Sequence, residues 1–283
     1  MLLLALALVF ELLAKVLLTV LFRIDIRQAG LEIGFWTAMK AALAGSAVSR
    51  LLPAGGALTP SAMGWAAKTE ADNAAGAALR ANVLTYGGLV AMTGAAVLWG
   101  VSTGRHPVIF AGQIIVGAGM VVVGVAVMAG GRVLPWVVGK LPRRLRKHFE
   151  ASVVRKGISF KEFVLVMTRV AAEAAVLWSA MLAFGIDLTP TQTMVAYGVS
   201  TVVGGAPGLP GGLGLIEGGL IGIISAFGYS AGMVVAPVLV YRLVDFWIIA
   251  GIGLIAGGLV VRDMAQSDVV IDLRDEPAPA ERE

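Results

Sequence analysis

Several charged residues lie inside strongly apolar stretches of this sequence, and four of them lie at or near two breaks in those stretches or in the spans that follow. They are Arg80, Glu217, Arg242 and Asp245. Ionisable side chains within apolar segments are costly, and in membrane proteins they mark substrate or ion pathways. An arginine presents a planar fork of donors that matches phosphate, whereas a carboxylate neutralises a cation or takes up a proton. We therefore treat these four residues as candidate substrate-binding residues.

Two short runs rich in proline and glycine interrupt the apolar sequence and divide it into half-segments. Their proline and glycine residues are Pro53, Gly55 and Gly56 in the first run, and Pro210, Gly211, Gly212 and Gly214 in the second. Proline removes a backbone donor and glycine disfavours helix, so we expect no continuous helix through either run. Within a bilayer, broken backbone is tolerated only where protein buries it or where it lines a wet cavity. Because transporters bind their substrates at paired broken helices, these seven residues join the candidate site.

The charged candidates also have structural explanations. Arg242 and Asp245 are three residues apart on one helix face and can pair with each other. Glu217 can recognise a cationic headgroup, take up a proton for coupling, or act as a helix cap and partner of an arginine. A half-helix that starts after Gly211 or Gly212 would point free N–H groups into the membrane interior, which favours an anion. If Arg80 and Arg242 face the same cavity, this arrangement favours a lipid phosphate.

The composition excludes most other classes of protein. The chain is 58% hydrophobic and 14% charged, with a mean hydropathy of +0.87, as expected for an integral membrane protein. It has no cysteine, and His106 and His148 lie far apart, so we expect no metal site. Since no nucleophile–base arrangement or dinucleotide-binding loop is present, we expect neither an enzyme nor a cofactor. Anionic lipid headgroups explain the net charge of +4 without nucleic acid.

The order of the apolar segments predicts an all-α polytopic membrane protein. We expect spans near residues 1–22, 78–101, 107–129, 163–184 and 234–261, and broken segments at about 35–68 and 191–225. Three spans separate the broken segments, so hairpins that return to their own side would enter from opposite faces. The prediction is a pair of inverted repeats, at about residues 31–129 and 160–262, whose two re-entrant hairpins meet near the midplane.

The distribution of charge predicts the domain layout and the orientation. Residues 1–262 are expected to form one transmembrane, transporter-like domain. Residues 132–161 carry nine basic residues and one acidic residue, so the positive-inside rule places this loop in the cytoplasm. Residues 263–283 carry seven acidic residues and two arginines, which predicts a disordered, acidic cytoplasmic tail.

The second break and the segment after it resemble a known family. Residues 209–219 read LPGGLGLIEGG, and Tyr241-Arg242-Leu243 and Phe246-Trp247 follow. This pattern is similar to the signature of the lysylphosphatidylglycerol synthase transmembrane-region family, which includes the flippase half of the bacterial multiple peptide resistance protein. The family's first-half motif resembles residues 51–53, but it usually has an asparagine upstream and Gly-Glu plus an arginine downstream. Here two serines, Ser46 and Ser49, lie upstream, and residues 57–60 contain neither an acid nor an arginine.

The resemblance implies a flippase that moves lipid between the leaflets of the bacterial inner membrane for envelope biogenesis. Its substrate would be an anionic, aminoacylated or polyprenyl-phosphate-linked lipid, including a lipid-linked saccharide. Two alternatives stay open: a proton-coupled transporter of a small solute, and a non-transporting membrane partner of an envelope-synthesis enzyme. An opening toward lipid between the hairpins favours the flippase, a sealed central cavity favours the solute transporter, and an apolar, plugged midplane favours the partner.

Overall fold

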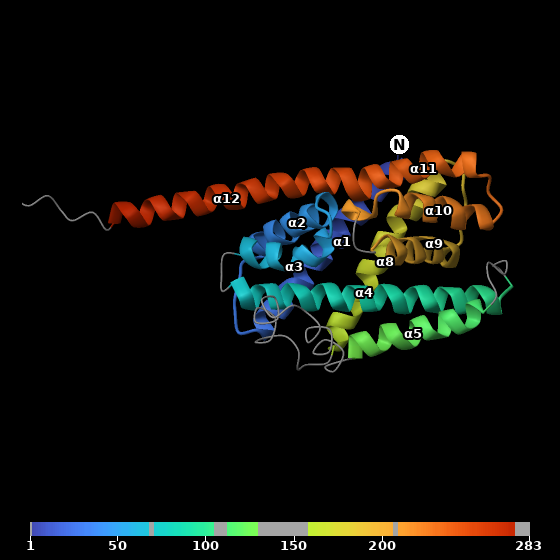
Figure 1. Ribbon diagram of the computed structural model, residues 1–283, viewed down its shortest axis with the longest axis horizontal. Helices are drawn as coiled ribbons and strands as arrows, with labels where there is room; N and C mark the ends of the chain where they lie inside the picture. The colour runs from blue at the N-terminus through green and yellow to red at the C-terminus, as the bar shows by residue number, and fades with distance from the viewer. Residues whose placement is uncertain (1, 68–70, 105–111, 130–157, 206–208, 275–283) are drawn as a thin grey trace, which may run out of the picture.

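Long apolar helices dominate the computed structural model, which describes residues 2–67, 71–104, 112–129, 158–205 and 209–274 (Figure 1). Within these ranges the regular structure is helical throughout, and no strand occurs. The helices long and apolar enough to cross a membrane are Leu2–Gln28, Asp72–Ser102, Phe160–Ala183 and Ala231–Gln266. Each exceeds the roughly 20 residues that a span requires. The prediction of an all-α polytopic membrane protein is confirmed.

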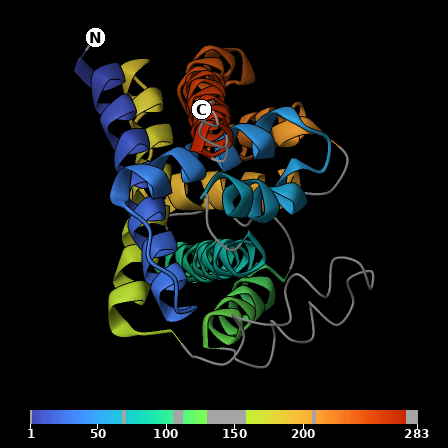
Figure 2. The same cartoon turned by 90° about the vertical axis from the view of Figure 1, so that its left-hand side faces the viewer.

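The long helices form the frame that holds the rest. They are α1 (Leu2–Gln28), α4 (Ala71–Ser102), α8 (Phe160–Ala183), and α11 (Ala231–Arg242), which continues through the π-helical turn η2 (Leu243–Ile248) into α12 (Ile249–Arg274). The shorter α5 (Gln113–Ala129) packs along α4. Helices α1 and α8 lie side by side and cross the direction of α4 and α12 (Figures 1 and 2).

Two hairpins of half-helices fill the space inside this frame. The first consists of α2 (Phe35–Leu51) and α3 (Gly55–Ala66), and the second of α9 (Pro190–Gly204), the 3₁₀ turn η1 (Pro210–Gly212) and α10 (Leu215–Ala226). These helices have 17 residues or fewer, too short to cross the hydrocarbon core alone. The helices therefore break at the two predicted proline–glycine runs.

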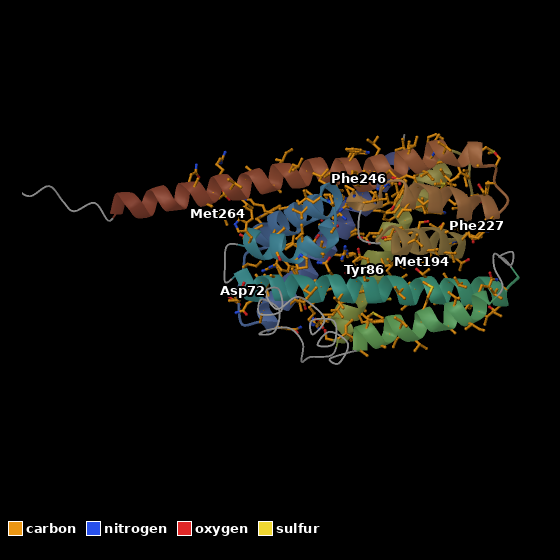
Figure 3. The ribbon with its side chains drawn as sticks, in the orientation of Figure 1. Asp72, Tyr86, Met194, Phe227, Phe246 and Met264 are labelled. Carbon is orange, nitrogen blue, oxygen red and sulfur yellow. The ribbon has the colours of Figure 1, made fainter. Side chains whose placement is uncertain are left out.

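The open ends of the two hairpins face opposite ends of the molecule. Asp72, which follows the first hairpin, and Phe227, which follows α10, lie at opposite ends in Figure 3, with Tyr86 and Phe246 between them. The order of elements also recurs, because α1, the first hairpin and α4 are matched by α8, the second hairpin and α11–α12. This arrangement is compatible with the predicted inverted repeat, which itself stays a prediction.

Local sequence explains where the second half begins its helices. Ser159 and Glu162 form a reciprocal capping box at the start of α8, in which each side chain accepts the other's backbone N–H. Thr189 and Gln192 form the same arrangement at the start of α9, directly before Pro190, whose missing N–H costs nothing in the first turn. These caps fix the start of the helices on either side of the turn at residues 184–189.

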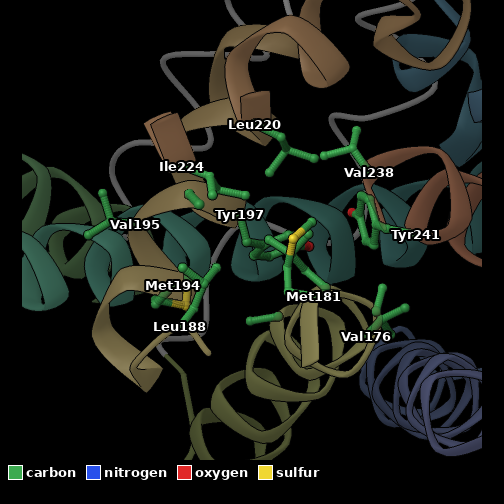
Figure 4. Packing of buried hydrophobic residues seen from close by; sticks show 14 of the residues in the cluster. Val176, Met181, Leu188, Met194, Val195, Tyr197, Leu220, Ile224, Val238 and Tyr241 are labelled. Carbon is green, nitrogen blue, oxygen red and sulfur yellow. The ribbon is translucent and has the colours of Figure 1, made fainter. Parts of the chain in front are cut away.

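A buried hydrophobic cluster joins the second hairpin to its neighbours. Met181 of α8, Tyr197 of α9, Leu220 of α10 and Val238 of α11 belong to it and are all less than 7% exposed (Figure 4). Burying such side chains stabilises a fold by about 1.5–3 kcal/mol each. The second hairpin is therefore packed against helices on several sides.

One domain prediction needs correction, and another lies outside the described residues. Helix α12 continues to Arg274, so residues 263–274 are helical and the expectation of a tail disordered from residue 263 is wrong for them. Lys40 of α2 pairs with Asp263 at 2.8 Å, which fixes the start of this extension. Most of the predicted basic cytoplasmic loop at 132–161 and the end of the tail at 275–283 lie outside the described residues.

Candidate substrate-binding site

A cavity of about 550 Å³ lies between the tips of the two hairpins. The first tip contributes Gly55 and Gly56, and the second contributes Gly211 and Gly212. Arg242 and Asp245 line the same cavity. Six of the eleven predicted site residues therefore come together. The other five do not line the cavity: Pro53, Pro210, Gly214, Glu217 and Arg80. Of these, Glu217 binds the cavity-lining Arg242.

The cavity lies at the mid-length of three spanning helices. Lys15, the middle residue of α1, and Tyr86, at the middle of α4, both line it. Arg169 and Glu173 line it from either side of the middle of α8. A helix that spans a bilayer places its middle near the centre of the hydrocarbon. The cavity is therefore expected at about half the depth of the membrane.

The two helix breaks begin with the same backbone conformation and differ after the left-handed residue, where Gly55 starts α3 but Gly212 keeps a positive φ. In the first, Leu52 is extended (φ −98°, ψ 143°) and Ala54 is left-handed (φ 54°, ψ 22°). In the second, Leu209 is extended (φ −103°, ψ 132°) and Gly211 is left-handed (φ 51°, ψ 26°). Both breaks therefore read Leu-Pro, a left-handed residue, then Gly. The shared geometry follows from the shared sequence and explains why α2 ends at Leu51.

The tip of the second hairpin contacts both the first hairpin and η2. A Cβ atom on Gly211 would collide with the ring of Phe246 and would lie 3.0 Å from the carbonyl oxygen of Arg50. The positive φ therefore favours glycine at this position, and the close approach requires it. The contact brings the end of α2 against η1, so the two tips meet as predicted.

Arg242 connects the second tip to the helix that follows it. Its Nε donates to Glu217 at 2.6 Å, its Nη1 to Asp245 at 3.2 Å, and its Nη2 to the Gly211 carbonyl at 2.9 Å. The guanidinium also lies over the ring of Phe246, 4.8 Å from its centroid. The simple pair with Asp245 foreseen from the spacing exists, but Arg242 has two further partners.

The N–H groups of the three residues before α10 have partners within the tip. Glu217 accepts the N–H of Gly214 at 2.7 Å, and the N–H groups of Gly212 and Leu213 are bonded to the carbonyls of Leu209 and Pro210. Glu217 thus acts as a cap and as an arginine partner, which is one of the alternatives for this residue. At the other tip, the first turn of α3 lines the cavity, so its positive dipole end faces the cavity.

The sequence prediction missed four charged residues that join this site. Arg50, at the end of α2, donates from Nη2 to the Asp245 carboxylate at 3.2 Å and from Nε to the Asp245 carbonyl at 2.8 Å. Lys15 pairs with Glu11 at 2.8 Å, and Arg169 pairs with Glu173 at 3.1 Å. Lys15, Arg50, Arg169 and Glu173 all line the cavity. Their positions inside apolar helices were the available signal, since such charges are costly there.

Arg80 lies in a separate cluster, contrary to the expectation that it shares a cavity with Arg242. Its Nη1 binds the carboxylates of Asp25, from α1, and Glu162, from α8. Gln28 also donates to Glu162, at 3.0 Å. The arginine is 5% exposed, and it is absent from the residues that line the cavity. This cluster ties α1, α4 and α8 together at the end of α1.

No group of three or more histidine, cysteine, aspartate or glutamate side chains in the described ranges is arranged to hold a metal. The site thus offers arginine and lysine cations, carboxylates, and tyrosine hydroxyls such as that of Tyr197, which donates to Glu173 at 2.8 Å. This chemistry suits reversible binding of a charged, oxygen-rich group.

Comparison with known proteins decides the family. The model of the lysylphosphatidylglycerol synthase TM region matches residues 1–253, which include both hairpins and the whole cavity. The chain belongs to this family. The resemblance carried by residues 209–219 and 241–247 is thereby confirmed.

Two curated relatives are similar to parts of the chain, and both are named UPF0104 membrane protein. Both come from Methanothermobacter thermautotrophicus (strain ATCC 29096 / DSM 1053 / JCM 10044 / NBRC 100330 / Delta H). One is 30% identical over 146 residues, which cover 45% of this chain and 43% of the relative. The other is 27% identical over 93 residues, which cover 33% of this chain and 28% of the relative. The matched segments thus span less than half of each relative.

Proposed function

We propose that this protein is a lipid flippase, which moves a lipid with an anionic headgroup between membrane leaflets and makes no covalent change. The observation that carries the proposal is the division of the cavity wall into two kinds of surface. Residues that both line the cavity and are exposed at the surface are mainly apolar: Ala54, Gly56, Ala57, Val202, Gly205, Leu209 and the aromatic Tyr86. The charged residues that line it are buried or half-buried, with Lys15 at 3% and Arg242 at 4% exposure.

Such a wall complements an amphipathic ligand. The exposed rim is formed by the hairpin tips, at the depth where a bilayer offers acyl chains rather than water. A headgroup can therefore lie against the buried charges while its chains stay outside, in the lipid. A solute transporter would need polar rather than apolar residues at this rim, since dissolved solutes arrive through water. The rim favours the flippase over the proton-coupled solute transporter.

The buried charges favour phosphate as the group recognised. Arg50 and Arg242 reach the same point from different elements, and a guanidinium matches phosphate oxygens with two parallel donors. Both arginines lie at the tips of the hairpins or beside them. The proposed location is the bacterial cytoplasmic membrane, with the C-terminus in the cytoplasm. A docking role for an envelope-synthesis enzyme has no comparable observation in its favour.

Reconstitution into vesicles tests the proposal. Fluorescent phosphatidylglycerol that reaches the inner leaflet is protected from a membrane-impermeant quencher, so protection measures translocation. The variant Ala57→Trp places a bulky ring at the rim of the cavity and should slow translocation about tenfold or more, which corresponds to ~1.4 kcal/mol. The matched control is Leu58→Trp, because Leu58 is 46% exposed but does not line the cavity.

The outcomes separate the candidate functions. Translocation by the wild type, lost in Ala57→Trp and kept in Leu58→Trp, supports the flippase. Vesicles that flip lipid no faster than protein-free vesicles contradict it. Equal slowing by both tryptophan variants would mean that lipid does not pass the rim at Ala57.

A further inference from the structure

The Asp245 carboxylate fills the place between two arginines that the proposed lipid phosphate would need. Its Oδ1 accepts a hydrogen bond from Arg50 Nη2 and its Oδ2 accepts one from Arg242 Nη1, both at 3.2 Å. Hydrogen bonds between charged groups are usually about 2.7–2.9 Å long. The Nε atoms of the same two arginines bind other acceptors at 2.8 and 2.6 Å. The carboxylate is thus held more loosely than the arginines themselves.

Both arginines stay anchored if the carboxylate moves away. Arg50 Nε donates to the backbone carbonyl of Asp245, and Arg50 Nη1 donates to the carbonyl of Ser46 at 3.3 Å. Arg242 keeps its bonds to Glu217 and to the carbonyl of Gly211. These anchors leave one Nη group of each arginine directed at a common point. The geometry is that of a preformed anion site in which Asp245 stands in for the anion.

The charges around Asp245 sum to zero. The cations are Lys15 of α1, Arg50 of α2, Arg169 of α8 and Arg242 of α11, and the acids are Glu11, Glu173, Glu217 and Asp245 itself. The neutral phenols of Tyr197 and Tyr241 are also buried beside them. A bound phosphate diester, such as that of phosphatidylglycerol, adds one negative charge to this neutral group. An uncompensated buried charge is strongly destabilising, so the added charge must be neutralised.

Asp245 is the acid best placed to supply that neutralisation. Glu11 and Glu217 do not line the cavity, and Glu217 also caps α10. Glu173 lines the cavity but keeps Arg169, Lys15 and the Tyr197 hydroxyl as partners, none of which the phosphate would take. Asp245 alone among these acids would lose both arginine Nη partners to a ligand bound between Arg50 and Arg242.

We propose that a lipid phosphate displaces the Asp245 carboxylate from between Arg50 and Arg242, and that Asp245 takes up one proton in the exchange. The inference rests on the proposed lipid translocation and specifies how it is coupled. No bond in the lipid forms or breaks. The proton comes from the aqueous phase and converts the carboxylate to a carboxylic acid, so the buried charge is unchanged. Each lipid bound therefore carries one proton, and translocation responds to a pH gradient.

Counting protons tests the exchange without any variant. Binding of a short-chain phosphatidylglycerol is followed by calorimetry in two buffers of different ionisation enthalpy, which gives the number of protons taken up per lipid. By linkage, uptake of one proton also weakens binding about tenfold for each unit of pH increase. Glycerophosphoglycerol, the deacylated headgroup, is titrated in parallel as a water-soluble phosphate diester with the same phosphate chemistry.

Two variants locate the proton. Asp245→Asn cannot take up a proton there, so its lipid binding should occur without proton uptake and without the tenfold pH dependence. The matched control is Asp263→Asn on α12, which pairs with Lys40 outside the cavity and should behave as the wild type does. Asp245→Glu keeps the carboxylate and should keep proton uptake, which also guards against a folding defect in Asp245→Asn.

The possible results separate this inference from the proposed function. Binding of lipid without proton uptake by the wild type overturns the inference, as does proton uptake that persists in Asp245→Asn. Proton-linked binding of lipid in a protein that does not flip it supports the exchange and contradicts the flippase. Proton-linked binding of glycerophosphoglycerol, with no binding of lipid, supports the exchange and favours a solute transporter.

Discussion

Replacement of Arg242 by lysine should have nearly as severe an effect as its removal. Arg242 serves three acceptors on different elements: Glu217, Asp245 and the carbonyl of Gly211. A lysine ammonium is a single point at the end of a flexible chain and cannot reproduce this spread of donors. We expect Arg242→Lys to lose about two of the three bonds, at ~1.5 kcal/mol or more each. Arg242→Ala should cost about 3–5 kcal/mol, because it leaves buried acids without their partner.

A double-mutant cycle with Glu217 measures how much of the stability lost in Arg242→Ala comes from the interaction between Arg242 and Glu217. Glu217→Gln removes the charge that Arg242 neutralises, so the double variant Arg242→Ala/Glu217→Gln should be more stable than the sum of the single changes predicts, by about 1–3 kcal/mol. Thermal unfolding of the purified protein in detergent gives the stabilities, and vesicle reconstitution gives translocation. Translocation should be abolished in Arg242→Ala and only partly recovered in Arg242→Lys.

A matched arginine supplies the control for this cycle. Arg262 lies on α12 and is exposed, so Arg262→Lys should leave both stability and translocation unchanged. If Arg242→Lys keeps wild-type stability and translocation, the argument that three separate guanidinium donors are needed is refuted. Strict additivity in the cycle would show that Glu217 and Arg242 do not share the interaction that the 2.6 Å contact indicates.

Two further predictions follow from the helix breaks and the opposed hairpins. Gly211→Ala should destabilise the protein by ~2–5 kcal/mol, because it adds a left-handed non-glycine residue and a clash with Phe246. Ala54→Gly should be neutral or stabilising by up to ~1 kcal/mol, since relief of the positive φ is offset by greater freedom in the unfolded chain. Thermal unfolding measures both, and a large loss in Ala54→Gly would contradict the matched conformation of the breaks. Because the chain has no cysteine, Glu32→Cys and Ser230→Cys report the two hairpin mouths directly. An impermeant reagent should label the cysteine at 230 in intact cells and the one at 32 only after permeabilisation, and labelling of both from one side would contradict inverted hairpins.

The breaks could be predicted from sequence because their causes are local. Proline at 53 and 210 and the glycines that follow oppose helix whatever surrounds them. The contact of Arg242 with Asp245 was also local, since three residues separate them on one helix. The family signature at residues 209–219 lies in the same short region. Residues close together in the sequence were therefore enough to predict the two hairpins and the Arg242–Asp245 pair.

The rest of the site depends on packing between distant segments. Arg50 meets Asp245 across 195 residues, and Arg80 meets Glu162 across 82. Periodicity says which face of a helix is apolar but not which neighbour that face will meet. The sequence therefore could not show that Arg80 belongs to a separate cluster while Arg50 belongs to the cavity. The charges in the middle of α1 and α8 were visible, but their convergence was not.

The distribution of the buried charges among the helices bears on how the protein is assembled in the membrane. Three long segments each contain a cation and an acid within one turn: α1 has Glu11 and Lys15, α8 has Arg169 and Glu173, and α11–η2 has Arg242 and Asp245. Each can therefore enter the bilayer as a nearly neutral unit.

The hairpins lack this internal neutralisation. Arg50 has no acid on α2 or α3, and Glu217 is the only charged residue on α9 or α10. Their partners, Asp245 and Arg242, lie three residues apart in α11–η2, which follows both hairpins in the chain. Both hairpin tips should thus settle at mid-depth only after α11 has inserted, so that this one span completes both halves of the site at once.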